Sequence, residues 1–140
     1  MKSIIFDLSL GDQKEDNVMF GEQEVSRFRE MIGLPVSLPL TGAGGLVEPQ
    51  LLAGRAFAGV ADLCSGFPIV PIQQEVIFIE SVRLGEQICL KAEVIDIEQS
   101  RGWITFSLEA VNSDGNAVMA GQIVVSFNDK GNAGKNAKRG

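Results

Sequence analysis

Residues 87–112, with the sequence QICLKAEVIDIEQSRGWITFSLEAVN, decide the fold. Between Trp103 and Asn112 the residues alternate between an apolar set and a mixed set. Gln87–Glu98 follows the same period of two less strictly, and Gln99–Gly102 separates the two segments as a turn. Such alternation is typical of antiparallel strands that bury one face. The apolar set of the second segment consists of Ile104, Phe106, Leu108 and Ala110.

Further strands are predicted on both sides of this hairpin. Ile69–Ser81 is rich in β-branched residues and alternates in part, and Gly85-Glu86 marks the turn that follows it. Ser113–Asn116 is a hairpin turn with Gly115 where a positive φ is needed, and Ala117–Phe127 is the last strand. We therefore expect four long strands joined by short turns in an antiparallel meander.

Two helices are predicted before these strands, after a short strand at Ser3–Leu8. The first helix opens at residues 20–24, where acidic side chains suit the helix dipole, and ends before Gly33. Two prolines and three glycines then predict a loop that ends at Gly45. The second helix is expected at Leu46–Leu63, because its many small residues allow close packing against a sheet. Pro49 fits only near the start of this helix.

This order of elements predicts an α+β protein in which a strongly curved antiparallel sheet wraps around one central helix, the hot-dog arrangement. The chain has 140 residues and a mass of 15.0 kDa, which suits one domain, and we place that domain at residues 1–127. Residues 128–140 are rich in Gly, Asn and Lys. We expect them to form a disordered basic tail rather than a binding arm.

The composition argues against several classes of function. The chain has no His, which excludes a Ser-His-Asp triad, a Cys-His pair and any His-ligated zinc. Its net charge of −6 argues against binding to nucleic acid. No apolar run approaches the roughly 20 residues of a membrane span. No cluster has metal-ligand spacing, so we expect neither a metal nor a cofactor.

The two cysteines, Cys64 and Cys89, are far apart in the sequence and have apolar neighbours. With no signal peptide in view, they are interpreted as reduced core thiols of a cytoplasmic protein. A disulfide between them is the alternative. A catalytic thiol is not expected, because no His is present to activate it.

Five segments, in this order, resemble the MaoC-like hot-dog family, which includes (R)-specific enoyl-CoA hydratases and 3-hydroxyacyl-thioester dehydratases. The resemblance spans about Phe6 to Phe127. It implies a hot-dog fold, an acyl thioester ligand carried by CoA or an acyl carrier, and a place in fatty acid metabolism. It also implies a homodimer, or a heteromer with a related hot-dog subunit. The segments are FDLSLGD (6–12), EQEVSRFREMIG (22–33), LVEPQLLAG (46–54), QEVIFIESVRLGEQI (74–88) and SDGNAVMAG (113–121).

The resemblance implies a lyase reaction, the hydration of a 2-enoyl thioester or its reverse. In the family, an Asp and a His soon after the first helix activate water, and a backbone N–H at the start of the central helix binds the thioester oxygen. Here the segment LPVSLPLTGAGG after Gly33 contains neither residue, and Glu48-Pro49 stands where the family has His-Gly. Pro49 has no N–H to donate. The usual hydratase or dehydratase activity is therefore not expected.

Glu48 is the candidate catalytic residue. Hot-dog thioesterases similarly place an acidic residue on the central helix, from which a carboxylate could direct water at the thioester carbonyl. The alternative is a first-turn Glu that interacts with the helix dipole and stays solvated. The candidate ligand-binding residues around Glu48 are Gly45, Leu46, Pro49, Leu52 and Arg55.

Other residues have two interpretations each. Arg55 could pair with Glu48 or reach a ligand phosphate, or it could lie on a rim or a subunit interface. Asp62 is a possible buried carboxylate, with a purely structural role as the alternative. Gly42, Gly44 and Gly45 could cradle a phosphate, but no Lys follows in the P-loop pattern, and a Gly-rich turn is the alternative.

Three functions remain open from the sequence. The first is a MaoC-like domain that binds an acyl thioester or similar apolar ligand without hydratase chemistry, alone or as the non-catalytic partner in a heteromer. The second is an active enzyme of changed chemistry, either a thioesterase that uses Glu48 or an atypical 3-hydroxyacyl dehydratase. The third is an assembly protein whose ligand tunnel is filled by its own side chains.

Overall fold

The computed structural model describes residues 8–34 and 45–127. The predicted tail, nearly all of the predicted strand Ser3–Leu8 and most of the predicted Gly-rich loop lie outside these residues. The elements in chain order are β1 (Gln13–Val18), α1 (Glu22–Met31), α2 (Pro49–Leu63), β2 (Val70–Phe78), β3 (Ile88–Glu98), β4 (Trp103–Asn112) and β5 (Ala117–Ser126).

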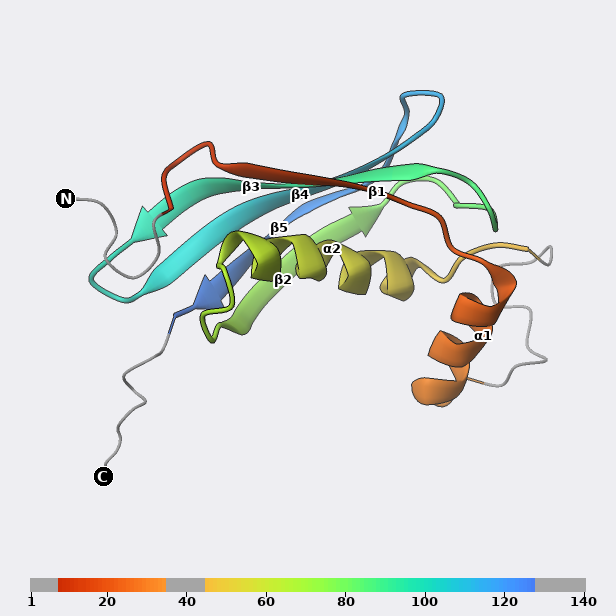
Figure 1. The fold of residues 1–140 in the computed structure, drawn as a ribbon, viewed down its shortest axis with the longest axis horizontal. Coiled ribbons are helices and arrows are strands. Elements are labelled where there is room, and N and C mark those ends of the chain that lie inside the picture. Colours follow the sequence, from red (N-terminus) through yellow and green to blue (C-terminus); the bar gives the residue numbers. More distant parts are fainter. Residues whose placement is uncertain (1–7, 35–44, 128–140) are drawn as a thin grey trace.

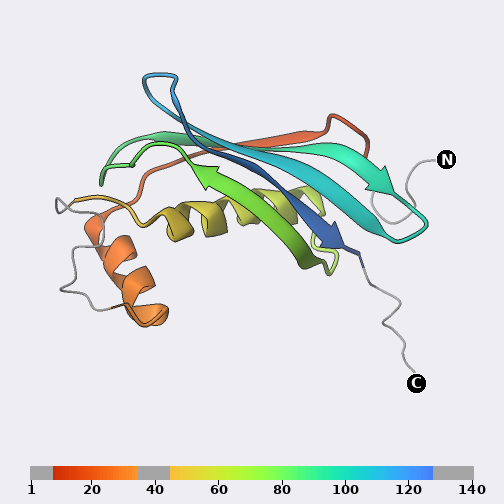
Figure 2. The same ribbon diagram turned by 180° about the vertical axis from the view of Figure 1, so that it is seen from behind.

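The strands form one antiparallel sheet with the order β1-β3-β4-β5-β2. The sheet curves around α2, which lies along its concave side and packs against β1, β3 and β4 (Figures 1 and 2). The shorter helix α1 lies beyond the N-terminal end of α2 (Figure 1). The predicted α+β arrangement, a curved sheet around a central helix, is therefore confirmed.

The core lies between α2 and the three middle strands. On β4 the alternation predicted from the sequence is confirmed, because the apolar set from Ile104 to Ala110 is buried. On the helix, Val60 is fully buried, and Gly59 lets β1 and β3 come close: a Cβ at Gly59 would lie 3.6 Å from Lys14 Cγ and 3.9 Å from Ala92 Cβ. The small residues of α2 thus serve the close packing that the sequence predicted.

The predicted meander of four consecutive strands is wrong at its first connection. β2 pairs with β5, so β4 and β5 separate β2 from β3. The turn at Gly85 exists, with φ +79°, but its N–H donates to the carbonyl of Phe20 and not to β2. A local turn signal shows that the chain reverses there, but it carries no information about which strand becomes the neighbour.

Gly121 makes the pairing of β2 with β5 possible. It lies opposite Val76 in the register. A Cβ at Gly121 would overlap the carbonyl oxygen of Glu75 and would lie 2.6 Å from Val76 Cα. The absence of a side chain therefore lets the two backbones approach closely at this point.

The first strand of the sheet is β1, which the sequence analysis missed. It has the sequence QKEDNV and pairs with β3 from Gln13 opposite Glu93 to Val18 opposite Ile88. Five of its six residues are charged or amides in direct succession, so no apolar alternation marks it as a strand. Leu8, the one described residue of the predicted strand Ser3–Leu8, lies outside any strand.

Both helices end as predicted, and one starts later than predicted. The Glu24 carboxylate accepts a hydrogen bond from the Gly21 N–H at 2.6 Å and caps the start of α1. Gly33 follows its end with φ +85°. The helix α2 begins at Pro49 and not at Leu46, because the segment before it forms a β-bridge, Leu46 opposite Arg83.

Candidate functional site

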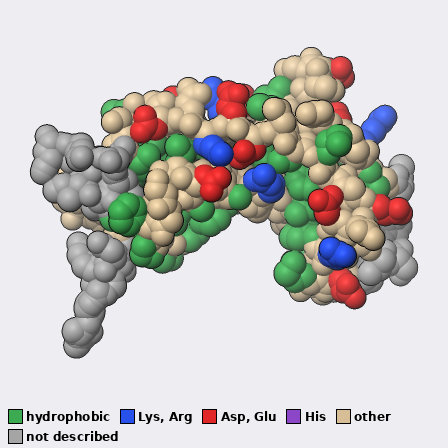
Figure 3. All heavy atoms as spheres, in the orientation of Figure 1, with side chains coloured by type: hydrophobic (Ala, Val, Ile, Leu, Met, Phe, Trp, Pro, Cys, Tyr) green, Lys and Arg blue, Asp and Glu red, His purple; other side chains and the backbone are tan. Residues whose placement is uncertain are grey.

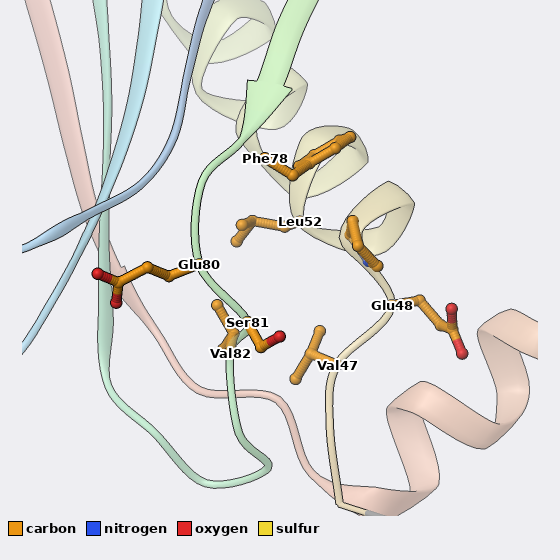
Figure 4. Close-up of a pocket in the computed structure, with 8 residues that line it drawn as sticks. Val47, Glu48, Leu52, Phe78, Glu80, Ser81 and Val82 are labelled. Atoms are coloured by element: carbon orange, nitrogen blue, oxygen red, sulfur yellow. The ribbon is translucent and has the colours of Figure 1, made fainter. Parts of the chain in front are cut away.

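A small pocket lies at the N-terminal end of α2 (Figure 4). One wall comes from the start of α2 and the residue before it, and the other from the end of β2 and the segment that follows. Its volume is about 30 Å³, which is room for about two water molecules. The lining residues are Val47, Glu48, Pro49, Leu52, Phe78, Glu80, Ser81 and Val82.

Backbone hydrogen bonds hold the two walls together. The N–H of Val47 donates to the carbonyl of Val82 at 2.8 Å, and the N–H of Leu84 donates to the carbonyl of Gly45 at 2.6 Å. Gly45 itself has φ +97°, a conformation that favours glycine. The predicted ligand residues Gly45 and Leu46 therefore lie in the strand-like segment that leads to the pocket, outside its lining.

Glu48 is the N-cap residue of α2, and its carbonyl accepts the N–H of Leu51 at 3.0 Å. The residue is only 4% exposed, so the alternative of a solvated first-turn Glu is wrong. Its carboxylate Oε2 lies 3.2 Å from Nε of Arg29, which comes from α1. Figure 4 shows this carboxylate pointing away from the pocket and toward the neighbouring helix. This pairing could not be predicted from the sequence, because it depends on where α1 lies relative to α2.

Pro49 occupies the first position of α2, as its chemistry requires. It lines the pocket together with Leu52. A helix start normally presents several free N–H groups, but the one at Pro49 is missing. The pocket therefore lacks the backbone donor that the residue at this position would otherwise supply.

Arg55 lies apart from the pocket and from Glu48. Its guanidinium Nη1 is 3.9 Å from Oδ2 of Asp16 on β1, so the suggested pair with Glu48 is wrong. Nζ of Lys14 lies 3.6 Å from Asp16 and 3.5 Å from Asp62. The side chain of Asp62 is 64% exposed, which corrects its interpretation as a buried carboxylate. Figure 3 shows charged side chains gathered where β1 passes α2.

Of the six candidate site residues, the pocket brings together Glu48, Pro49 and Leu52. The opposite wall was missed. Phe78, Glu80 and Ser81 were assigned to a strand that in the structure ends at Phe78. The signal in the sequence was the polar pair Glu80-Ser81 at the end of an apolar run, where a strand often gives way to a site-forming loop.

The two thiols are free, and their environments differ. Cys64 is fully buried, and burial raises its pKa to about 11, so it is a poor nucleophile at neutral pH. Burial and then the charge of Glu15 also raise the pKa of Cys89. The interpretation as a core thiol is therefore confirmed for Cys64 and wrong for Cys89, which is half-buried and lies near charged side chains.

Carboxylate and thiol side chains are spread over several elements of residues 8–34 and 45–127. Within these ranges, no three carboxylate or thiol side chains are grouped as metal ligands would be. Neither of the helices described there is long and apolar enough to cross a membrane.

The architecture, with its long helix wrapped by a curved antiparallel sheet, is the hot-dog fold. The (R)-hydratase of A. caviae involved in PHA biosynthesis superimposes with a TM-score of 0.76 at 18% identity, over 86% of this chain and 97% of that chain. The unliganded R-hydratase of Pseudomonas aeruginosa gives 0.72 at 17% identity, with coverages of 86% and 83%. A mutant fluoroacetyl-CoA-specific thioesterase gives 0.68 at 10% identity, with coverages of 85% and 87%.

The chain is thus similar in fold to hydratases and to a thioesterase, and the resemblance seen in the sequence is confirmed at the level of fold. The sequence itself matches no protein-family model and no curated protein.

Proposed function

We propose that this protein is a hot-dog domain that binds an acyl thioester without catalysing its hydration or dehydration. The observation that carries this proposal is Pro49 at the first position of α2, in the lining of the pocket. Loss of one oxyanion donor costs about 10²–10³-fold in rate. The chain also has no His to act as general base. The (R)-hydratases and the thioesterase of similar fold support the ligand class.

A second copy of the chain completes the ligand site in this proposal, because about 30 Å³ is far too small for an acyl chain. The apolar edge strand β2 supports a homodimer. Val70, Ile77 and Phe78 are exposed along it, and the pocket lies beside its C-terminal end. A heteromer with a related hot-dog subunit is the other outcome, and the test is the oligomeric state of the purified chain.

The geometry of β2 indicates which groups are free to pair. The N–H of Ile79 donates to the carbonyl of Val118 on β5. Backbone groups alternate in direction along an antiparallel strand, so those of Gln74, Val76 and Phe78 point to the open edge. A second β2 strand, running antiparallel, would extend the sheet through these groups.

Hydrolysis of the thioester with Glu48 as base is a second candidate. The burial of Glu48 beside the pocket favours it. For this reaction the carboxylate would have to turn from Arg29 toward the bound ligand. The free thiols of Cys64 and Cys89 suit a reducing compartment, and we place either activity in the cytoplasm.

The test is incubation of the full chain with a panel of enoyl-, 3-hydroxyacyl- and saturated acyl-CoA thioesters, followed by mass spectrometry and by calorimetric titration. We expect micromolar-range binding of at least one thioester with no change in mass. Gain or loss of one water would contradict the proposal. Release of free CoA would favour the second candidate.

A Glu48→Gln variant separates binding from hydrolysis. If Glu48 is the base, CoA release stops while thioester binding is retained. The matched control is Glu80→Gln, which changes the other carboxylate of the pocket lining and leaves the Arg29 pair intact. CoA release that survives in the Glu48→Gln protein would exclude the Glu48 mechanism.

A further inference from the structure

Ser81 is a distinctive member of the pocket lining. Five of the eight lining side chains, those of Val47, Pro49, Leu52, Phe78 and Val82, have no polar atom, and the polar atoms of the two glutamate side chains are carboxyl oxygens. Among these eight residues, Ser81 therefore has the one hydroxyl side chain, which can donate a hydrogen bond.

The backbone on both sides of Ser81 is fixed. Glu80, the preceding residue, donates its N–H toward the carbonyl of Val118 at 3.5 Å, and Ile79 donates to the same oxygen at 2.8 Å. Val82, the following residue, accepts the N–H of Val47 at 2.8 Å. Hydrogen bonds therefore hold the residue before Ser81 to the sheet and the residue after it to the segment that leads into α2.

The orientation of Ser81 fits a role in the pocket. Figure 4 shows its hydroxyl directed toward the wall that carries Val47, across the space in front of the start of α2. The side chain of Glu80 extends in the opposite direction (Figure 4). Ser81 is also exposed to solvent, so a ligand can reach it without unfolding the site.

We propose that the Ser81 hydroxyl donates a hydrogen bond to the carbonyl oxygen of a bound thioester and takes the place of the N–H that Pro49 lacks. This inference rests on the proposed function and names a residue that binds the ligand at the same pocket. Ser81 acts as an anchor and not as a nucleophile. The carboxylate of Glu48 faces Arg29 and that of Glu80 extends away, so neither is placed to take the hydroxyl proton.

The test compares two ligands that differ at the carbonyl, hexanoyl-CoA and its thioether analogue S-hexyl-CoA. Their affinities are measured by calorimetric titration for the full chain and for Ser81→Ala. We expect the substitution to lower the affinity for hexanoyl-CoA about 3- to 10-fold, the usual range for one neutral hydrogen bond. S-hexyl-CoA lacks the acceptor, so its affinity is expected to stay within about 2-fold.

Two control variants complete the experiment. Ser81→Thr keeps the hydroxyl and should retain the preference for the thioester. Ser100→Ala removes an exposed hydroxyl from the β3–β4 turn, remote from the pocket, and should change neither affinity.

An equal loss of affinity for both ligands in Ser81→Ala would overturn the inference, because Ser81 would then contribute by its shape and not by a hydrogen bond to the carbonyl. An unchanged affinity for hexanoyl-CoA would overturn it as well, while the proposed function stood. If the unaltered chain bound neither ligand and no other member of the thioester panel, the proposed function would fail and the inference with it.

Discussion

The two edges of the sheet have opposite chemistry. At one edge, β1 reads QKEDNV, and its side chains form ion pairs with the outer side of α2, including Lys14 with Asp62. At the other edge, β2 reads VPIQQEVIF, and its apolar residues are exposed, with Ile77 at 64%. Both strands have one neighbour in the sheet, so composition rather than position distinguishes them.

A single sheet can direct association through the chemistry of its two edges. An unpaired edge with apolar side chains is a template for another strand, and natural proteins block such edges with charges. β1 is blocked in this way and β2 is open. Gly121 keeps β2 close to β5, so the open edge depends on one residue of its neighbour.

The largest effect is expected from Gly121→Val, which would break the β2 edge. The new side chain would overlap the backbone of β2 at Glu75 and Val76. We expect a loss of about 3 kcal/mol in the free energy of unfolding, as for severe overpacking. Urea denaturation followed by circular dichroism measures it.

The matched control for this experiment is Gly54→Ala on α2. A Cβ at Gly54 meets no atom within 4 Å, and the residue lies inside a helix. The substitution should stabilise the protein by about 0.5–1 kcal/mol. A Gly121→Val protein as stable as the parent would show that β2 does not need the close approach.

An intermediate effect is expected from Ile77→Lys, which would make the β2 edge resemble β1. Ile77 is exposed, so folding should change by no more than about 0.5 kcal/mol. Association through β2 should weaken at least about tenfold, or about 1.4 kcal/mol, because a charge would have to be buried. Sedimentation velocity over a concentration series measures the dimer fraction.

Ile95→Lys serves as its control. Ile95 is an exposed apolar residue of β3, which is not an edge strand. It should leave the dimer fraction unchanged. Equal loss of dimer in both variants would mean that association does not use the β2 edge.

The smallest effect is expected from Asp62→Asn, which would remove one ion pair from the β1 edge. Lys14 would lose a partner at 3.5 Å and keep Asp16. Since the Asp62 side chain is 64% exposed, the cost should stay below about 1 kcal/mol and should shrink at high salt. Urea denaturation at two ionic strengths tests this, and a salt-independent loss of several kcal/mol would contradict it.

Features that depend on residues close together in the chain could be predicted from the sequence, and features that depend on distant segments could not. The alternation on β4 and the small residues of α2 are local patterns, and both were interpreted correctly. β1 was missed because an edge strand covered with charges shows no apolar period. The neighbour of β2 and the pairing of Glu48 with Arg29 depend on contacts between distant segments, which no local pattern encodes. For the same reason, five of the eight residues that line the pocket were not predicted.

The difference between the edges also limits how many copies of the chain could associate through the sheet. In a pair related by a twofold axis, each copy would use its β2 edge, and the two β1 edges would lie at the outer ends of the joined sheet. Both ends would then carry charges that discourage further strand addition. A protomer with two open edges could add copies without limit and form a fibre. With one edge of each kind, assembly through the sheet would stop at two copies.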